Sequence, residues 1–349
     1  MYDMKHCSRI NMTEIKTNSN EIKSDFTKKM AAITVAAVLF VSVFGGNLMT
    51  LQAMADNGNS TNPSSNSVPT NEKQAARQTL RQTLQQDQVT YKQAVQTADL
   101  AYKQVVQTAN LAHSQSVQDA NTAYNQAVQD ARTAYNTAIK GVHGNVAIIG
   151  PAMATRDQAI ATADATKTNA VVSANVARDK TIYDAWATHE TTVYTALATR
   201  DGTDGTAQST FYTAIGNATL ATRAQTIGQA HATEDNAILQ ARETRITTVE
   251  TADVTKDQAI GAAQTAYTSA ETTARVTLDN AYTSDGKTWN AGLQSYWSTV
   301  APLEQTRDSA IAIANANHET TVGNADATRD QAIDQAHATM YGIISSAYP

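Results

Sequence analysis

Residues 91–134 read YKQAVQTADLA, YKQVVQTANLA, HSQSVQDANTA and YNQAVQDARTA in consecutive blocks of eleven. We number the positions of the block from Tyr91, so that position one is tyrosine or His113, position five is valine and position eight is alanine. Eleven residues over three turns is about 3.67 residues per turn, so these positions stay nearly in line along a helix. The blocks therefore predict a long amphipathic helix that packs along its length.

The same pattern continues to the end of the chain, where position five is Ile344 and position eight is Ala347. Only 17% of the residues are charged and 6% are aromatic, so a thick globular core would be poorly supplied. Long helices that pack along a narrow apolar seam need fewer large apolar residues than a globular core does. We expect an all-α protein of very long helices with 11-residue periodicity, packed as a right-handed coiled coil or as an antiparallel helical bundle.

Glycine and proline clusters divide the repeat array. They occur at residues 141–151, 201–205 and 284–287, and Pro302 follows. These residues predict helices over 73–141, 152–200, 206–283 and 288–347, with Pro302 starting or kinking the last. The first array, 73–141, has tyrosine at position one, whereas 152–349 has mainly arginine, lysine and histidine there.

Position one supplies a candidate interaction seam. Its members are Tyr91, Tyr102, Tyr124, Tyr135, Arg156, Arg178, Arg307 and Arg329. Each of these arginines precedes an aspartate, and neighbouring residues on a helix point about 100° apart. We therefore expect each arginine to pair across a seam with the same motif on an antiparallel helix, and not with its own neighbour. The alternative is a row of arginines that faces an anionic polymer or headgroup.

Residues 289–297, WNAGLQSYW, differ from the repeat chemistry and form a candidate aromatic patch of Trp289, Tyr296 and Trp297. Trp289 and Leu293 keep the spacing of one helix face, which favours burial at the end of a bundle. The alternative is an exposed patch that docks a partner.

The N-terminus predicts export. Two lysines, Lys28 and Lys29, precede an apolar run over residues 31–44, and Ala53-Met54-Ala55 offers a cleavage site. We expect residues 1–55 to be a signal peptide, or an uncleaved anchor, and residues 56–72 to be a disordered linker. The product would be secreted or held in the cell envelope, and its only cysteine, Cys7, would leave with the leader.

The sequence predicts no catalytic residues, no cofactor and no metal. The tetrads at 189–192 and 318–321, HETT, begin like a zinc-protease helix, but the second histidine is replaced by Val193 and Val322. The formal net charge of −6 gives no reason to expect nucleic acid as a partner.

The period over residues 73–347 resembles that of exchangeable apolipoproteins, late-embryogenesis-abundant proteins and other hendecad-repeat helical proteins. That resemblance implies lipid-surface binding or stress protection. From the residues themselves we expect an exported, non-catalytic structural or protein-interaction protein that associates with itself or with another helical protein. An amphipathic protein that binds a membrane surface is the alternative, and an extracellular stress-protective protein is a more distant one.

Overall fold

The chain divides into two units, Met1–Ser67 and Val68–Pro349. The computed structural model describes residues 68–142, 144–282 and 286–348, all in the second unit. They form the helices α3 (Thr70–Ala138), α4 (Val146–Ala214), α5 (Ala218–Asn280) and α6 (Gly286–Ser346), with no strand among them. The all-α prediction is confirmed. The predicted leader and residues 56–67 of the predicted linker lie outside the described residues. The linker prediction is wrong at its end, because residues 70–72 belong to the first turn of α3.

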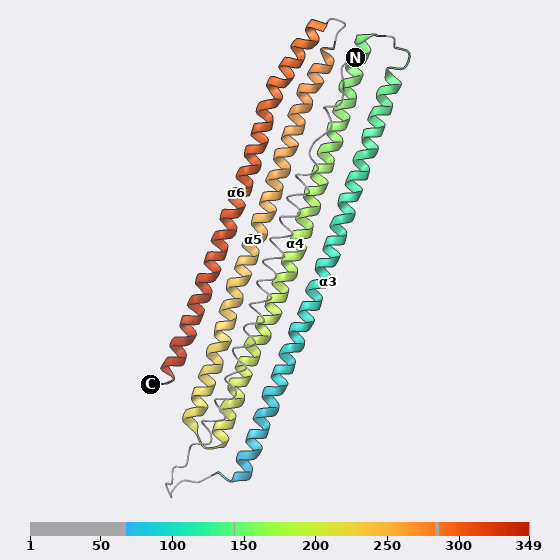
Figure 1. Ribbon diagram of the computed structural model, residues 1–349. Helices are drawn as coiled ribbons and strands as arrows, with labels where there is room; N and C mark the ends of the chain where they lie inside the picture. Colours follow the sequence, from blue (N-terminus) through green and yellow to red (C-terminus); the bar gives the residue numbers. More distant parts are fainter. Residues whose placement is uncertain (1–67, 143, 283–285, 349) are drawn as a thin grey trace. The chain divides into compact units, whose positions relative to one another are not determined.

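The four helices run antiparallel, side by side in chain order (Figure 1). Within the described part of the chain, α3 packs only on α4, and α6 packs only on α5. The 69 residues of α3 give a helix roughly 100 Å long. The unit is therefore an open row with two edge helices, and only α4 and α5 have a neighbour on each side.

Small residues make many of the contacts within the row. The buried residues of α3 are Ala98, Ala109, Ala120 and Ala131, all at position eight. In α6 the buried residues again include position-eight alanines, such as Ala325. Alanine projects little beyond the backbone, so neighbouring helices approach closely and the buried layer between them is thin.

The predicted helix end at 201–205 is wrong, because α4 continues through it to Ala214. A Cβ atom on Gly205 would lie 2.7 Å from the Cα of Gly228 in α5. Glycine at this position therefore allows two helices to approach, and it does not mark a chain reversal. The reversal comes later, at Gly216, where φ is +80° and the N–H of Asn217 donates to the carbonyl of Tyr212 at 2.8 Å.

Two prolines, Pro151 and Pro302, lie inside helices. Helix α4 begins at Val146, where the side chain of Asn145 accepts from the N–H of Ala147 at 3.1 Å, so Pro151 falls in the second turn. Helix α6 runs through Pro302, so the start or split expected there is not found. Val300, just before it, is 2% exposed and packs in a cluster with Leu278, which holds this part of α6 on α5. The interruption expected at 284–287 coincides with the start of α6, and residues 283–285 lie outside the described residues.

Candidate functional site at the helix seams

Aromatic rings of α3 face cations and an imidazole of α4 along most of the seam. We call these four contacts the rungs. They are Tyr135–Arg156 (4.8 Å from guanidinium carbon to ring centroid), Tyr124–Lys167 (4.5 Å from ammonium nitrogen to ring centroid), Tyr102–His189 (5.8 Å between ring centroids) and Tyr91–Arg200 (4.9 Å from guanidinium carbon to ring centroid). A cation over an aromatic ring is attracted by the negative face of the ring, at about 0.5–1 kcal/mol for an exposed pair.

The rungs follow one register. From Tyr135–Arg156 to Tyr91–Arg200, each step down α3 by one or two repeats is matched by an equal step up α4. The fifth position-one residue of α3, His113, would face Arg178 in this register, but it contacts Asn175 Oδ1, one turn away on α4, at 2.7 Å. A slip of α3 against α4 would therefore break all the rungs together.

The expectation that each arginine avoids its neighbouring aspartate is wrong. Arg156 Nε donates to Asp157 Oδ1 at 2.5 Å, and Arg178 Nε donates to Asp179 Oδ1 at 2.7 Å. The angle of about 100° between adjacent residues describes the Cβ directions. An arginine side chain is long enough for its guanidinium to bend back to the next carboxylate. Arg156 consequently faces Tyr135 with its charge already balanced.

The two predicted arginines of α6 make the same local pair. Arg307 Nε donates to Asp308 at 2.9 Å, and its guanidinium carbon lies 4.5 Å from the ring centroid of Tyr267 in α5. Arg329 Nε donates to Asp330 Oδ1 at 2.8 Å, and its Nη1 donates to Asp326 within α6 at 3.0 Å. The structure therefore places Arg307 on the α5–α6 seam, whereas these hydrogen bonds of Arg329 stay within α6.

Histidines and carboxylates pair across the α5–α6 seam. His337 Nδ1 lies 2.5 Å from Glu234 Oε1, and His318 Nε2 lies 2.7 Å from Asp253 Oδ1. The hydroxyl of Tyr183 in α4 also donates to Asp253, at 2.5 Å. Burial works to raise the pKa of Asp253, but the contacts from His318, Lys256 and Tyr183 outweigh it and hold that pKa well below the usual range.

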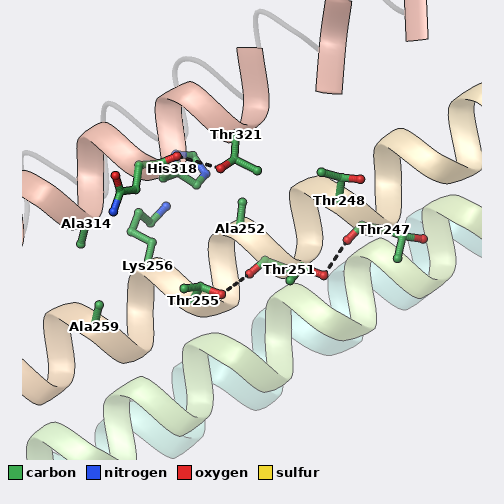
Figure 2. A pocket seen from close by; sticks show the side chains of 11 residues that line it. Thr247, Thr248, Thr251, Ala252, Thr255, Lys256, Ala259, Ala314, His318 and Thr321 are labelled. Carbon is green, nitrogen blue, oxygen red and sulfur yellow. Dashed lines mark hydrogen bonds between the residues drawn. The ribbon is translucent and has the colours of Figure 1, made fainter. Parts of the chain in front are cut away.

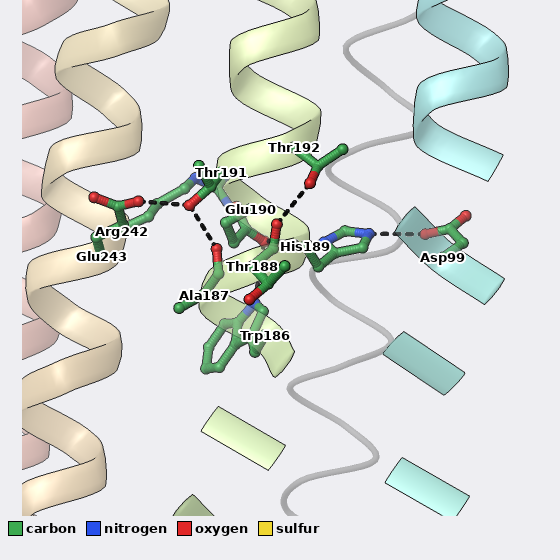
Figure 3. A network of polar contacts seen from close by, with 10 residues as sticks. All are labelled: Asp99, Trp186, Ala187, Thr188, His189, Glu190, Thr191, Thr192, Arg242 and Glu243. Atoms are coloured by element: carbon green, nitrogen blue, oxygen red, sulfur yellow. Dashed lines mark hydrogen bonds and ion pairs between the residues drawn. The ribbon is translucent and has the colours of Figure 1, made fainter. Parts of the chain in front are cut away.

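The HETT tetrad of α4 is divided between two neighbours (Figure 3). His189 Nε2 lies 2.8 Å from Asp99 Oδ1 in α3. Glu190, 4% exposed, accepts from Trp186 Nε1 at 3.1 Å and from Arg242 Nη1 in α5 at 3.2 Å. His189 Nδ1 also lies 3.9 Å from Glu190 Oε1. Residues 68–142, 144–282 and 286–348 contain no group of three or more histidine, cysteine or acidic residues that could hold a metal ion.

Several carboxyls are buried with no cation to balance them fully. Burial, together with nearby Asp87, raises the pKa of Asp204 to about 7. Burial and the neighbouring Asp201 raise the pKa of Asp235 to about 7. Burial and Asp157 raise the pKa of Asp279 to about 6. These three carboxyls therefore take up protons at a higher pH than free aspartates do.

A shallow groove of about 420 Å³ lies between α5 and α6 (Figure 2). Five of its eleven lining residues are threonines, and Lys256 from α5 and His318 from α6 also line it. The hydroxyl of Thr251 donates to the carbonyl of Thr247 at 2.9 Å, and that of Thr255 donates to the carbonyl of Thr251 at 2.7 Å. Because these hydroxyls donate to their own helix, the groove presents few free donors to a ligand.

The predicted aromatic patch is not one surface. Tyr296 is buried, and its hydroxyl donates to Glu271 of α5 at 2.7 Å. Trp289 is half-buried, with its ring 5.3 Å from that of Tyr282. Only Trp297 is exposed, at 60%.

The sequence reasoning missed the partners of the tyrosines. Lys167, His189 and Arg200 complete three of the rungs, and all three lie at multiples of eleven residues from Arg156. A count from Arg156 in steps of eleven reaches all three within the predicted helix 152–200, so the repeat itself indicates these partners.

Comparison with known proteins adds no relative: no family model, no curated protein and no solved structure matches the chain. None of the helices in the described ranges has a stretch long and apolar enough to cross a membrane.

Proposed function

We propose that this protein is an exported, non-catalytic structural or protein-interaction protein of the cell surface or envelope. In this proposal the 11-residue repeat is the packing unit of an antiparallel, coiled-coil-like array. The observation that carries the proposal is the single register of the rungs from Tyr135–Arg156 to Tyr91–Arg200. A seam that repeats one contact over most of a long helix suits a protein whose length and stiffness matter.

The polar chemistry of the row supports the same proposal. Buried Glu190 of α4 binds Arg242 of α5, and Asp253 of α5 binds His318 of α6. These groups stabilise the contacts between helices and leave little chemistry directed at a substrate. Such charged pairs fix register and orientation more than they add stability.

A lipid-surface protein is the competing class, and the packing of the row argues against it. The position-eight alanines of the repeat face neighbouring helices, as Ala98 and Ala109 of α3 do on α4. A lipid surface could reach them only if the row opened, and it would then have to replace every seam contact.

Circular dichroism of the full chain, with and without anionic vesicles, separates the two classes. We expect high helicity and cooperative melting without lipid, unchanged by vesicles. A chain that is disordered alone and becomes helical on vesicles would overturn the proposal. Export is tested separately by sequencing the N-terminus of the protein recovered outside the cell, where we expect Asp56 as the first residue.

A further inference from the structure

The two edge helices, α3 and α6, each have one side without a neighbour in the described part of the chain (Figure 1). On α3 this side carries an exposed apolar stripe at position ten of the repeat. Its members, Val89, Leu100 and Leu111, are 46%, 67% and 71% exposed. Position ten lies about 200° around the helix from the alanines that are buried on α4, so the stripe points away from the row. Its regular spacing distinguishes it from scattered surface leucines.

Both edges also carry a row of charges, and the two rows have opposite sign. The exposed cations at position two of α3 are Arg81, Lys92 and Lys103. The exposed carboxylates at position two of α6 are Asp308, Glu319 and Asp330. The preceding arginine binds Oδ1 of Asp308 and of Asp330, yet these two side chains stay 64% and 63% exposed. No exposed lysine or arginine interrupts the acidic row within residues 289–348.

We infer that the α3 edge of one copy of this chain binds the α6 edge of a second copy, with the two helices antiparallel. This inference rests on the proposed function and names its partner. Helices α3 and α6 run in opposite directions within the row, so a second copy placed beside the first in the same orientation makes this contact (Figure 1). The interface is head-to-tail, because two different edges meet in it.

The flanks of the contact favour the antiparallel arrangement. Both edges are centred on position ten, and position two lies about 65° to one side of that centre. Because one helix of an antiparallel pair is reversed, residues at the same repeat position lie on the same flank of the contact. The cations of α3 therefore meet the carboxylates of α6 along one flank. A parallel pair would place the two rows on opposite flanks.

The charges also select one register. Placing Lys92 opposite Glu319 of the second copy aligns the whole of both rows, and a shift of one repeat in either direction leaves only two pairs. On the other flank, exposed Asp119 of α3 falls at the height of Gly292 and meets no carboxylate there. The three pairs in this register are Arg81–Asp330, Lys92–Glu319 and Lys103–Asp308.

The apolar residues fit the same register. Leu100 falls between exposed Ser309 and Ala312 of the second copy, and one repeat away Val89 falls beside exposed Gly323. These α6 residues occupy positions three and six, which lie about 33° to either side of position ten. Small side chains thus straddle the centre of the α6 edge and leave room for each larger side chain of α3, as knobs pack into holes.

The contact is displaced along the helices. The seam contacts that set the heights within one copy are Tyr102–His189, Glu190–Arg242 and Arg245–Asp326. They place Lys103 near the height of Asp326. In the inferred contact Lys103 instead faces Asp308, eighteen residues away on α6, so successive copies are shifted by about 27 Å. A shifted head-to-tail contact does not close into a flat ring, so association continues into a ribbon.

Cysteine cross-linking of the full chain, with Cys7→Ser as the background, tests the register. We expect Leu100→Cys and Ala312→Cys to stay uncross-linked when each is oxidised alone, and to form a disulfide-linked dimer when mixed. The matched control mixes Leu100→Cys with Gly323→Cys, which lies one repeat away on the same face of α6 and should not cross-link. Self-cross-linking of Leu100→Cys, equal cross-linking with Gly323→Cys, or none with Ala312→Cys would overturn the inference.

Sedimentation velocity of the Cys7→Ser chain tests the ion pairs. We expect Lys92→Glu and Glu319→Lys each to raise the dissociation constant by about threefold or more. The two substitutions in one chain should restore the association, because the pair is then only reversed. Asp119→Lys, on the other flank of α3, is the matched control and should leave the association unchanged. A double variant that associates no better than the single variants would overturn the pairing of the two edges.

The same measurement separates this inference from the proposed function. We expect species that grow beyond a dimer as the concentration rises. A helical, cooperatively melting chain that stays monomeric at all concentrations would overturn the second-copy inference and leave the proposed function standing. A chain that is disordered without lipid would overturn the proposed function instead.

Discussion

The contact between Gly205 and Gly228 gives the sharpest test of the row, through Gly205→Ala. A methyl group on Gly205 would lie 2.7 Å from Gly228 Cα and 3.0 Å from the carbonyl oxygen of Ala224. These atoms belong to the backbone of α5, so no side chain can rotate away and the two helices must separate locally. Overpacking of this kind costs about 1–3 kcal/mol. Replacing a helical glycine by alanine returns about 0.5–1 kcal/mol, so we expect a net loss of about 1–2 kcal/mol in the free energy of unfolding.

Gly202→Ala is the matched control, because it lies one turn earlier on α4 and a methyl group added there would have nothing within 4 Å. Alanine has a higher helix propensity than glycine, and at this position its methyl group meets no neighbour. We therefore expect the free energy of unfolding to rise by about 0.5–1 kcal/mol. Urea denaturation followed by circular dichroism measures both variants. If the chain instead reversed at 201–205, Gly202→Ala would destabilise the protein. That outcome, or equal stabilisation by both substitutions, would refute a continuous α4 packed against Gly228.

Three further outcomes are expected. The pKa values of Asp204 and Asp235 are raised from 3.8 to about 7, so the folded chain holds protons that the unfolded chain releases. The stability from these protons is complete below the unfolded pKa and is lost as the pH rises through 7. Urea titrations should therefore show stability increasing by about 2–3 kcal/mol from pH 8 to pH 5, after allowance for solvent screening, and a profile that stays flat would contradict the assignment. In a double-mutant cycle on the Tyr124–Lys167 rung, with Tyr124→Leu and Lys167→Met, we expect a coupling energy of about 0.5–1 kcal/mol, and additive losses would show that the rung is incidental. Glu190→Ala should lower the free energy of unfolding in urea by about 2 kcal/mol, because Trp186 and Arg242 lose their acceptor. A loss below about 0.5 kcal/mol, the size expected of a surface substitution, would argue against the burial of Glu190.

The helical class could be predicted from the sequence, but the boundaries of α4 could not. Alanine every eleven residues, beginning at Ala98, places the small residues of α3 on one side of a helix, and those alanines are buried. Glycine carries two meanings: Gly205 allows a close approach, whereas Gly216 ends a helix with a positive φ. The sequence does not distinguish them by their caps, because Asn217 follows Gly216 and Thr206 follows Gly205, and both residue types can cap a helix.

Of the α3–α4 seam, the residues of α3 could be predicted from the sequence, but their pairing with residues of α4 could not. The tyrosines of α3 stand out by composition, but their partners depend on where α4 begins and on the length of the connection before it. Beginning α4 at Val146 rather than at 152, and continuing it past Arg200, brings Tyr91 and Arg200 together. The pairing of Arg156 with Asp157 depends on side-chain conformation, which the repeat does not specify.

The common register of α3 and α4 restricts how this protein can change length. Deleting one repeat from the middle of α3 would displace half of its tyrosines from their partners unless the facing repeat of α4 were deleted too. Because α4 also packs on α5, and α5 on α6, the compensation must continue across the row. Related chains that are longer or shorter should therefore differ by whole repeats taken from every helix at the same height, and single-repeat insertions should survive only at the ends of helices.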